Sequence, residues 1–150
     1  TRRSSDLYCG TGTIGIFLSP HVHRLIVVET VEDAVADAQI NAAWNGVSNS
    51  QFFCGDVIRV CQPSFFEQQG KPDLVILDPP RAGCHEDLLN KLLELKVPRI
   101  VYVSCNPATQ ARDLSVLQRE YQVDLSRAVD MFPHTHHVEN VVQLNLRQRV

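Results

Sequence analysis

A glycine-rich turn near the start of the chain has the sequence Asp6-Leu7-Tyr8-Cys9-Gly10-Thr11-Gly12-Thr13-Ile14-Gly15. We expect it to join a strand to a helix, because glycines in such a turn let the backbone approach a ligand closely. An apolar strand then ends in Glu29, at about the spacing where an acidic residue accepts hydrogen bonds from both ribose hydroxyls. A third strand end supplies Asp56. Together these strand ends predict a site for a cofactor that contains adenosine.

The rest of the chain alternates predicted strands and helices. Short apolar runs rich in Val and Ile, as in buried parallel strands, cover residues 25–28, 74–77 and 100–103. Helical spacing covers residues 32–45 and 86–95, and two further strands are expected over residues 122–131 and 138–146. This series predicts one α/β domain over residues 1–150. Its sheet should be mostly parallel and twisted, with helices on both faces and an antiparallel C-terminal strand.

Composition excludes several classes of protein. No apolar run is long enough to span a membrane, and no signal-peptide pattern opens the chain, so we expect a cytoplasmic protein with no membrane partner. The five cysteines are odd in number and include no C-x-x-C pair, which argues against a disulfide framework and against zinc or iron–sulfur ligation. We therefore expect no bound metal. The chain has no initiator Met, which suggests a fragment of a longer protein.

Cys105 is the candidate nucleophile. It follows the apolar run 100–103 within Ser104-Cys105-Asn106-Pro107, and a proline is well tolerated at the first position of a helix. The partial positive charge at a helix N-terminus favours a nearby thiolate. The alternative interpretation is a small buried hydrophobic residue, the commoner fate of a free cysteine.

The run Asp78-Pro79-Pro80-Arg81 directly follows the predicted strand 74–77. The two prolines fix the backbone φ angles and have no N–H groups, so they form a rigid surface that suits the face of a flat ring. The simpler interpretation is an ordinary loop after a strand. Enzymes that methylate exocyclic amines carry a similar run with an aromatic residue after the prolines. In this chain Arg81 occupies the position of that aromatic residue. The chain also has a candidate cysteine nucleophile, which methylation of an exocyclic amine does not need.

A pyrimidine ring carbon does need such a thiol, because C5 of uracil is a poor nucleophile. Addition of Cys105 to C6 would turn the ring into an enolate whose C5 attacks a methyl donor, and a base must then remove the C5 proton. Glu139 is the candidate base, since it lies where a turn meets the last apolar strand. On its own, Glu139 would be taken for an exposed charge at a strand end.

The donor is suggested by the first turn. Gly10, Gly12 and Gly15 nearly satisfy the dinucleotide pattern G-x-G-x-x-G, so NAD is an alternative ligand for this turn. The leading Asp6 instead resembles the S-adenosylmethionine turn of Rossmann-like methyltransferases. We expect the cofactor to contact the following residues: Asp6, Tyr8, Gly10, Gly12, Glu29, Asp56 and Asp78.

Taken together, the runs 78–83, 100–109 and 130–139 resemble the RNA 5-methyluridine methyltransferase family, over essentially the whole chain. The resemblance implies a class I Rossmann-like fold, S-adenosylmethionine as methyl donor and a uridine in tRNA or rRNA as substrate. It implies Cys105 as nucleophile and Glu139 as base. It also implies substrate contacts from Asp78, Pro79 and Arg81.

Full members of that family carry an upstream portion, often with a small RNA-binding β-barrel and sometimes an iron–sulfur cluster. The net charge of −3 and a pI near 6.0 indicate no broad track for a phosphate backbone. We therefore expect a monomer that binds cofactor weakly and RNA poorly by itself. Rival interpretations are a cytosine C5 methyltransferase and a catalytically silent cofactor-fold module. A metal site at His134, His136, His137 and Glu139 is disfavoured, because neighbours on an extended segment point to opposite sides.

Overall fold

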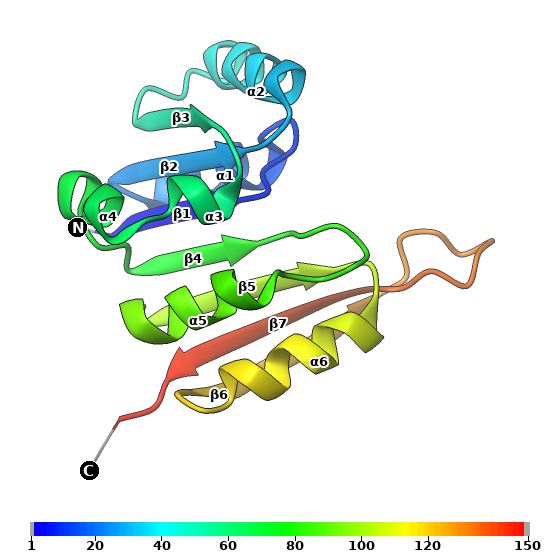
Figure 1. Ribbon diagram of the computed structural model, residues 1–150. Helices are drawn as coiled ribbons and strands as arrows, with labels where there is room; N and C mark the ends of the chain where they lie inside the picture. Colours follow the sequence, from blue (N-terminus) through cyan, green and yellow to red (C-terminus); the bar gives the residue numbers. More distant parts are fainter. Residues whose placement is uncertain (1, 149–150) are drawn as a thin grey trace. The chain divides into compact units, whose positions relative to one another are not determined.

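The computed structural model describes residues 2–148 (Figure 1). Within that range it has seven strands, six α-helices and one short 3-10 helix. The chain divides into two compact units, Thr1–Leu77 and Asp78–Val150, here called unit 1 and unit 2. None of the helices in the described range is long and apolar enough to cross a membrane.

Unit 1 contains four parallel strands in the order β3-β2-β1-β4. They are β1 (Arg3–Leu7), β2 (Arg24–Glu29), β3 (Ser50–Cys54) and β4 (Leu74–Leu77). The first turn, Glu29 and Asp56 follow or end β1, β2 and β3 respectively. Because parallel strands share one carboxyl edge, these three predicted cofactor segments lie along the same edge of the sheet.

Helices connect these strands, as the parallel pairing requires. They are α1 (Thr13–Leu18), the 3-10 helix η1 (Ser19–His21), α2 (Glu32–Trp44), α3 (Val57–Val60) and α4 (Pro63–Gln69). Helix α2 begins with Glu32 and Asp33, whose charges suit the positive end of a helix dipole. Proline at the first position favours the start of α4.

The core of unit 1 consists of its central strands. Residues 25–28 of β2 and 75–77 of β4 are buried on both faces, each at most 4% exposed. Burying one such side chain stabilises the fold by about 1.5–3 kcal/mol. Continuous apolar runs of this kind identify central parallel strands, which is why the sequence located β2 and β4 well.

Unit 2 holds three strands in the order β5-β7-β6, and both neighbouring pairs are antiparallel. The strands are β5 (Arg99–Ser104), β6 (Tyr121–Val129) and β7 (Glu139–Leu146), with helices α5 (Glu86–Leu95) and α6 (Pro107–Leu117). The two helices lie side by side in Figure 1. The connection between β6 and β7, orange in Figure 1, extends well beyond the strand ends.

The predicted α/β architecture is confirmed, and the bounds of β4 and α5 are those expected. Helix α2 ends one residue earlier than predicted, because Asn45 serves as its C-cap. Strand β6 stops at Val129, and β7 begins at Glu139 rather than at residue 138. The short helices α3 and α4 were missed, since one or two turns carry too little periodicity to stand out.

Candidate active site

The first turn is fixed to strand β2 by backbone hydrogen bonds. Tyr8 has a φ of 65°, and Gly10 and Gly12 have φ values of 53° and 83°. The Tyr8 amide donates to the Val28 carbonyl at 3.0 Å, and the Gly12 amide donates to the Cys9 carbonyl at 2.9 Å. Glycine allows these left-handed conformations without the penalty that a side chain imposes.

The two glycines of this turn have different functions. A Cβ atom added at Gly10 would meet no heavy atom within 4 Å, whereas one added at Gly12 would lie 3.0 Å from the Cβ of Ala38. Gly12 therefore permits close packing of α1 against α2. Gly10 leaves a space in which a ligand can approach the backbone, as the predicted cofactor turn requires.

Glu29 has a structural function that the sequence did not reveal. Its Oε2 accepts from the Gly10 amide at 2.9 Å, and its Oε1 accepts from the amides of Thr30 and Val31 at 2.7 and 3.0 Å. The residue is only 9% exposed. Glu29 thus holds the turns that follow β1 and β2, in addition to the ribose contact predicted for it.

The other predicted carboxylates of unit 1 differ in exposure. Asp56 is exposed and caps α3, since its Oδ1 accepts from the amides of Ile58 and Arg59 at 2.9 and 3.1 Å. Asp6 is fully buried, and a Cβ added at Gly15 of α1 would lie 2.8 Å from its Oδ2. Asp6 therefore lies in the interior beside α1.

Cys105 lies at the end of β5 beside the start of α6, as predicted. The Ser104 hydroxyl accepts from the Asn106 amide at 3.0 Å and donates to the Asn106 carbonyl at 3.1 Å. The Asn106 side chain caps α6 by accepting from the Ala108 amide at 3.1 Å. These bonds fix the turn that carries Cys105, whose side chain is half-buried.

The strand register brings the candidate base to this thiol. In the antiparallel pair of β5 and β7, Val103 faces Val141 and Ser104 faces Asn140. Cys105 directly follows Ser104 and Glu139 directly precedes Asn140, so the register brings both residues to the same end of the strand pair.

The Asp-Pro-Pro-Arg loop is attached to the same turn and helix. The Arg81 carbonyl accepts from the Asn106 side-chain amide at 3.1 Å and from the Thr109 hydroxyl at 3.0 Å. The Arg112 guanidinium donates to the Ala82 carbonyl at 2.9 Å. These contacts hold the loop that begins at Asp78 beside Cys105.

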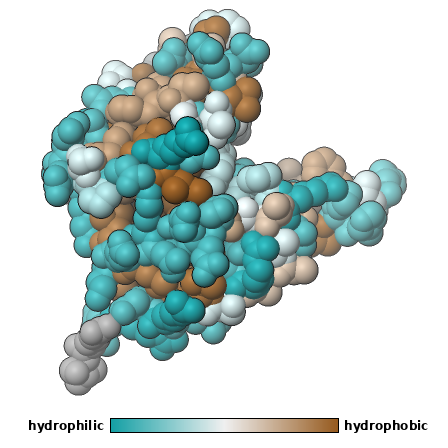
Figure 2. Space-filling view, viewed as in Figure 1, coloured by the Kyte–Doolittle hydropathy of each residue, from teal (hydrophilic) through white to brown (hydrophobic). Residues whose placement is uncertain are grey.

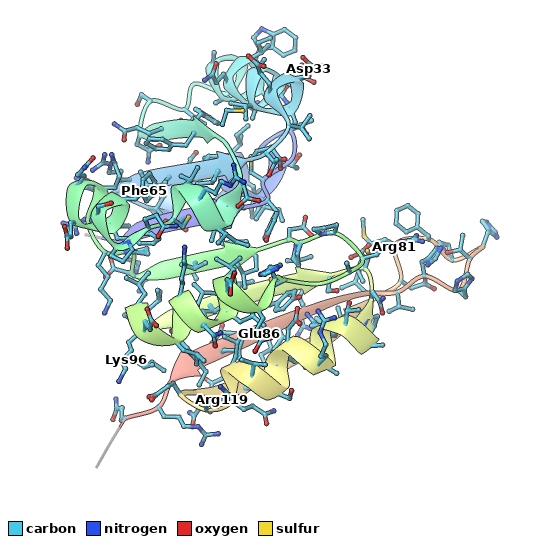
Figure 3. The ribbon with its side chains drawn as sticks, viewed as in Figure 1. Asp33, Phe65, Arg81, Glu86, Lys96 and Arg119 are labelled. Carbon is cyan, nitrogen blue, oxygen red and sulfur yellow. The ribbon has the colours of Figure 1, made fainter. Side chains whose placement is uncertain are left out.

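A cavity of about 420 Å³ opens at this place. Its lining comes from Arg81 of the loop, from Cys105 and Asn106 of the β5–α6 turn, and from residues 136–138 of the β6–β7 connection. Figure 3 shows Arg81 where the loop approaches that connection. The volume and the mixture of polar and apolar groups suit a ligand the size of a nucleotide.

His137 contacts Arg81 across the cavity, with 3.1 Å between its Nε2 and a guanidinium nitrogen. Arginine can only donate, so Nε2 accepts and the imidazole is neutral with its proton on Nδ1. Partial desolvation lowers the pKa of His137, and the electrostatic influence of Arg81 and His136 lowers it further. The Arg81 guanidinium in the cavity is therefore held by a neutral histidine.

Glu139 influences the ionisation of Asp78. Partial burial of the carboxyl, followed by the negative charge of Glu139, raises the pKa of Asp78 to about 6. The structure therefore brings both predicted carboxylates into one electrostatic environment, and at neutral pH Asp78 is mostly ionised.

Two other thiols are not suited to be nucleophiles. Burial raises the pKa of Cys84 to about 12. Burial, with the charges of Asp6 and Glu29, also raises the pKa of Cys9 to about 12. Among residues 2–148, no group of three or more His, Cys, Asp or Glu side chains is arranged to hold a metal ion.

Asp113 supports the candidate site from the interior, and the sequence analysis missed it. It is fully buried, and its Oδ2 accepts from the Tyr102 hydroxyl at 2.6 Å and from the Cys84 amide at 2.7 Å. Its Oδ1 pairs with the Arg112 guanidinium at 2.7 Å. Asp113 thus connects β5, α6 and the loop after Asp78. A charged residue among the apolar positions of α6 was the available signal.

A solved structure defines the class of protein. The crystal structure of the Pyrococcus abyssi tRNA (uracil-54, C5)-methyltransferase in complex with S-adenosyl-L-homocysteine matches 96% of this chain with a TM-score of 0.84 and 39% identity. This chain corresponds to 34% of that protein chain. The fold is therefore that of a Rossmann-like methyltransferase domain, as predicted.

A family model described as tRNA (Uracil-5-)-methyltransferase matches residues 67–147, and the chain belongs to this family. An uncharacterized RNA methyltransferase of Bacteroides thetaiotaomicron is 52% identical over 142 residues, which are 95% of this chain and 31% of that protein. Another from Porphyromonas gingivalis is 54% identical over 141 residues, or 93% of this chain and 30% of that protein. The chain thus spans about a third of these relatives.

Proposed function

We propose that this chain is the catalytic domain of an S-adenosylmethionine-dependent RNA (uracil-5-)-methyltransferase acting on a uridine in tRNA or rRNA through a covalent bond from Cys105 to C6. The observation that carries the proposal is the β5–β7 register, in which Ser104 pairs with Asn140, so that Cys105 and Glu139 are the neighbouring residues at the same end of the strand pair. Cys105 lines a cavity of nucleotide size together with Arg81 and Val138, and Glu139 directly follows Val138. Membership of the tRNA (Uracil-5-)-methyltransferase family supports it.

The residues of unit 1 fit an adenosine-containing cofactor. Gly10 gives the backbone an open approach, and Glu29 and Asp56 follow adjacent strands with acceptor oxygens suited to ribose and adenine groups. Tyr8, Gly12 and Asp78 would make the remaining contacts with the cofactor. Asp6 would support the turn from the interior. S-adenosylmethionine would supply the electrophilic methyl group. The S-adenosyl-L-homocysteine in the Pyrococcus abyssi structure supports this assignment.

Cys105 acts as the nucleophile and Glu139 as the general base. The thiolate adds to C6 of the uracil, and the C5–C6 π electrons form an enolate whose negative charge rests on O4. C5 takes the methyl group, after which Glu139 removes the C5 proton. The electrons of that C–H bond re-form the C5–C6 double bond and expel the thiolate. The enzyme regains its thiolate, and the proton leaves on Glu139.

Asp78 and Arg81 would recognise the uracil. An ionised Asp78 accepts a hydrogen bond from N3–H of uracil, whereas N3 of cytosine bears a lone pair that repels it. This explains a preference for uridine over cytidine. Arg81 places a positive charge near the enolate or the substrate phosphate. Pro79 and Pro80 form the rigid wall beside the ring.

The test is methylation of tRNA and rRNA transcripts by the complete gene product with S-adenosylmethionine, followed by mass analysis of the nucleosides. We expect 5-methyluridine from the wild type and from Cys54→Ala, which alters an exposed thiol of unit 1. We expect a loss of at least about 10³-fold from Cys105→Ala. 5-Methylcytidine would indicate a cytosine enzyme. Cofactor binding without any methylated product would indicate a silent module.

A further inference from the structure

Gln110 of α6 is a buried polar residue that the proposed chemistry does not use. Its side chain is 1% exposed, and all of its polar atoms are engaged. Nε2 donates to the Tyr102 carbonyl at 3.0 Å and to the Asn140 carbonyl at 3.2 Å. Oε1 accepts from the Asn140 side-chain amide at 2.7 Å. One side chain therefore connects the helix to both β5 and β7.

The contact with Asn140 adjoins the candidate base. Asn140 follows Glu139 directly and pairs with Ser104, the neighbour of Cys105. Gln110 holds both the carbonyl and the side chain of Asn140, so the backbone at the start of β7 cannot shift without breaking two hydrogen bonds. Since successive strand residues point to opposite faces, this attachment leaves the Glu139 carboxylate directed away from Gln110.

We propose that Gln110 is a positioning residue for proton removal: together with Asn140 it fixes β7 so that Glu139 reaches the C5 proton after Cys105 has added to C6. This inference rests on the proposed function and deepens it. An error of about 1 Å in the placement of a reacting group can cost about 10²-fold in rate. Cys105 lies on the β5–α6 turn, which Ser104 and Asn106 hold independently of Gln110. Its addition to C6 should therefore survive the loss of Gln110.

Because Cys105 and Glu139 are held by different contacts, loss of Gln110 should slow one step of the reaction and leave the other unchanged. A displaced base slows only the last step, in which the C5 proton leaves and the sulfur–C6 bond breaks. The methylated uracil then stays bonded to Cys105, and the adduct accumulates on ordinary uridine RNA. A merely structural defect would slow addition and elimination together.

The test compares Gln110→Leu with Gln118→Leu, an exposed glutamine at the end of the same helix. Single-turnover reactions of the complete gene product with uridine RNA and S-adenosylmethionine are resolved on denaturing gels. For Gln110→Leu we expect adduct formation within about 2-fold of the wild type, and turnover lower by about 10²-fold at saturating RNA. The adduct should accumulate. Gln118→Leu should behave as the wild type.

Unchanged turnover in Gln110→Leu, or an equal fall in adduct formation and turnover, would overturn the inference. If Gln110→Leu does not fold, Asn140→Asp is used, because it keeps the shape but loses the amide that donates to Oε1. Wild-type protein is also treated with RNA containing 5-fluorouridine, whose C5 cannot lose a proton. Absence of an adduct there would count against the proposed function itself. Its presence, without accumulation by the variants on uridine RNA, would count against Gln110 alone.

Discussion

The two units build their sites in different ways. In unit 1, backbone turns at the carboxyl edge of four parallel strands supply the site, and Glu29 and Asp56 hold amides of those turns. In unit 2, the proposed reacting groups come from segments far apart in sequence, and the antiparallel pairing of β5 with β7 brings these segments together. The connection that completes this site mixes hydrophilic and apolar surface (Figure 2), and it exposes Met131 and Phe132 by 60% and 54%.

Because the two units are built differently, they should differ in how far a single substitution disturbs the proposed site. A substitution at one strand end of unit 1 should alter one ligand contact and leave the other strand ends intact. A substitution that shifts β7 relative to β5 should displace the candidate base from the thiol and slow the last step of every turnover. We therefore expect the larger losses of activity in unit 2 and the more selective losses of binding in unit 1.

The largest effect after removal of the thiol should come from Glu139→Gln. Loss of the base should lower turnover by about 10²–10⁴-fold while addition of Cys105 continues, so a methylated adduct accumulates. Removal of the Glu139 charge should also lower the pKa of Asp78 from about 6, which NMR titration can follow. Asn140→Ala is not a matched control, because it disturbs Gln110. The exposed change Glu94→Ala serves instead, and it should leave both readouts unchanged.

Asp113→Ala tests the attachment of the loop to α6. Its loss leaves the Tyr102 hydroxyl and the Cys84 amide buried without their acceptor. We expect a fall of about 3 kcal/mol in the free energy of unfolding, measured by urea denaturation, because breaking a buried charged network is strongly destabilising. The exposed Asp87→Ala should cost less than about 0.5 kcal/mol. Equal effects from the two variants would show that Asp113 does not hold this unit together.

Gly10→Ala and Gly46→Ala form a matched pair in unit 1. Both glycines have positive φ, 53° and 66°, and a Cβ at either would meet no atom within 4 Å. Each change should therefore cost about 1 kcal/mol of folding free energy. Only Gly10→Ala should weaken S-adenosyl-L-homocysteine binding, by about 10-fold in calorimetry, since the added methyl group fills the ligand's approach. The same affinity in both variants would place the cofactor elsewhere.

The smallest effect concerns pH. The pKa of Asp78 is raised from 3.8 to about 6, so the folded protein retains a proton that the unfolded chain releases. The stability that this proton contributes is present below about pH 4 and is lost as the pH rises through about 6. Asp78→Asn lacks this loss, so its unfolding midpoint should rise relative to wild type between pH 4 and 7. A difference that stays constant with pH would contradict the assignment.

The sequence predicted most of unit 1 because its signals are local. Buried strands such as β4 consist of continuous apolar residues, and the turn after β1 is marked by its glycines. The place of Cys105 in the fold could also be predicted, since a strand end and the Asn-Pro helix start flank it directly. The role of Glu29 as an acceptor for turn amides could not, because those amides belong to segments on either side of β2.

The arrangement of unit 2 depends on pairings that no local pattern encodes. The place of Glu139 in the sequence suggests a base, but its arrival at the same end of the strand pair as Cys105 follows from a register between strands that are far apart along the chain. Gln110 and Asp113 act through side chains that meet other elements only in the folded protein. In a single sequence both resemble ordinary polar residues of a helix.

The most direct test is to trap the complete gene product on RNA containing 5-fluorouridine with S-adenosylmethionine and to map the modified residue by tandem mass spectrometry. Fluorine at C5 cannot leave as a proton, so elimination should stall. We predict a single modified residue, Cys105, linked to C6 of a pyrimidine that carries both fluorine and the transferred methyl group at C5. An adduct on another residue would contradict the paired roles of Cys105 and Glu139. So would the absence of any adduct from an enzyme that makes 5-methyluridine in ordinary RNA.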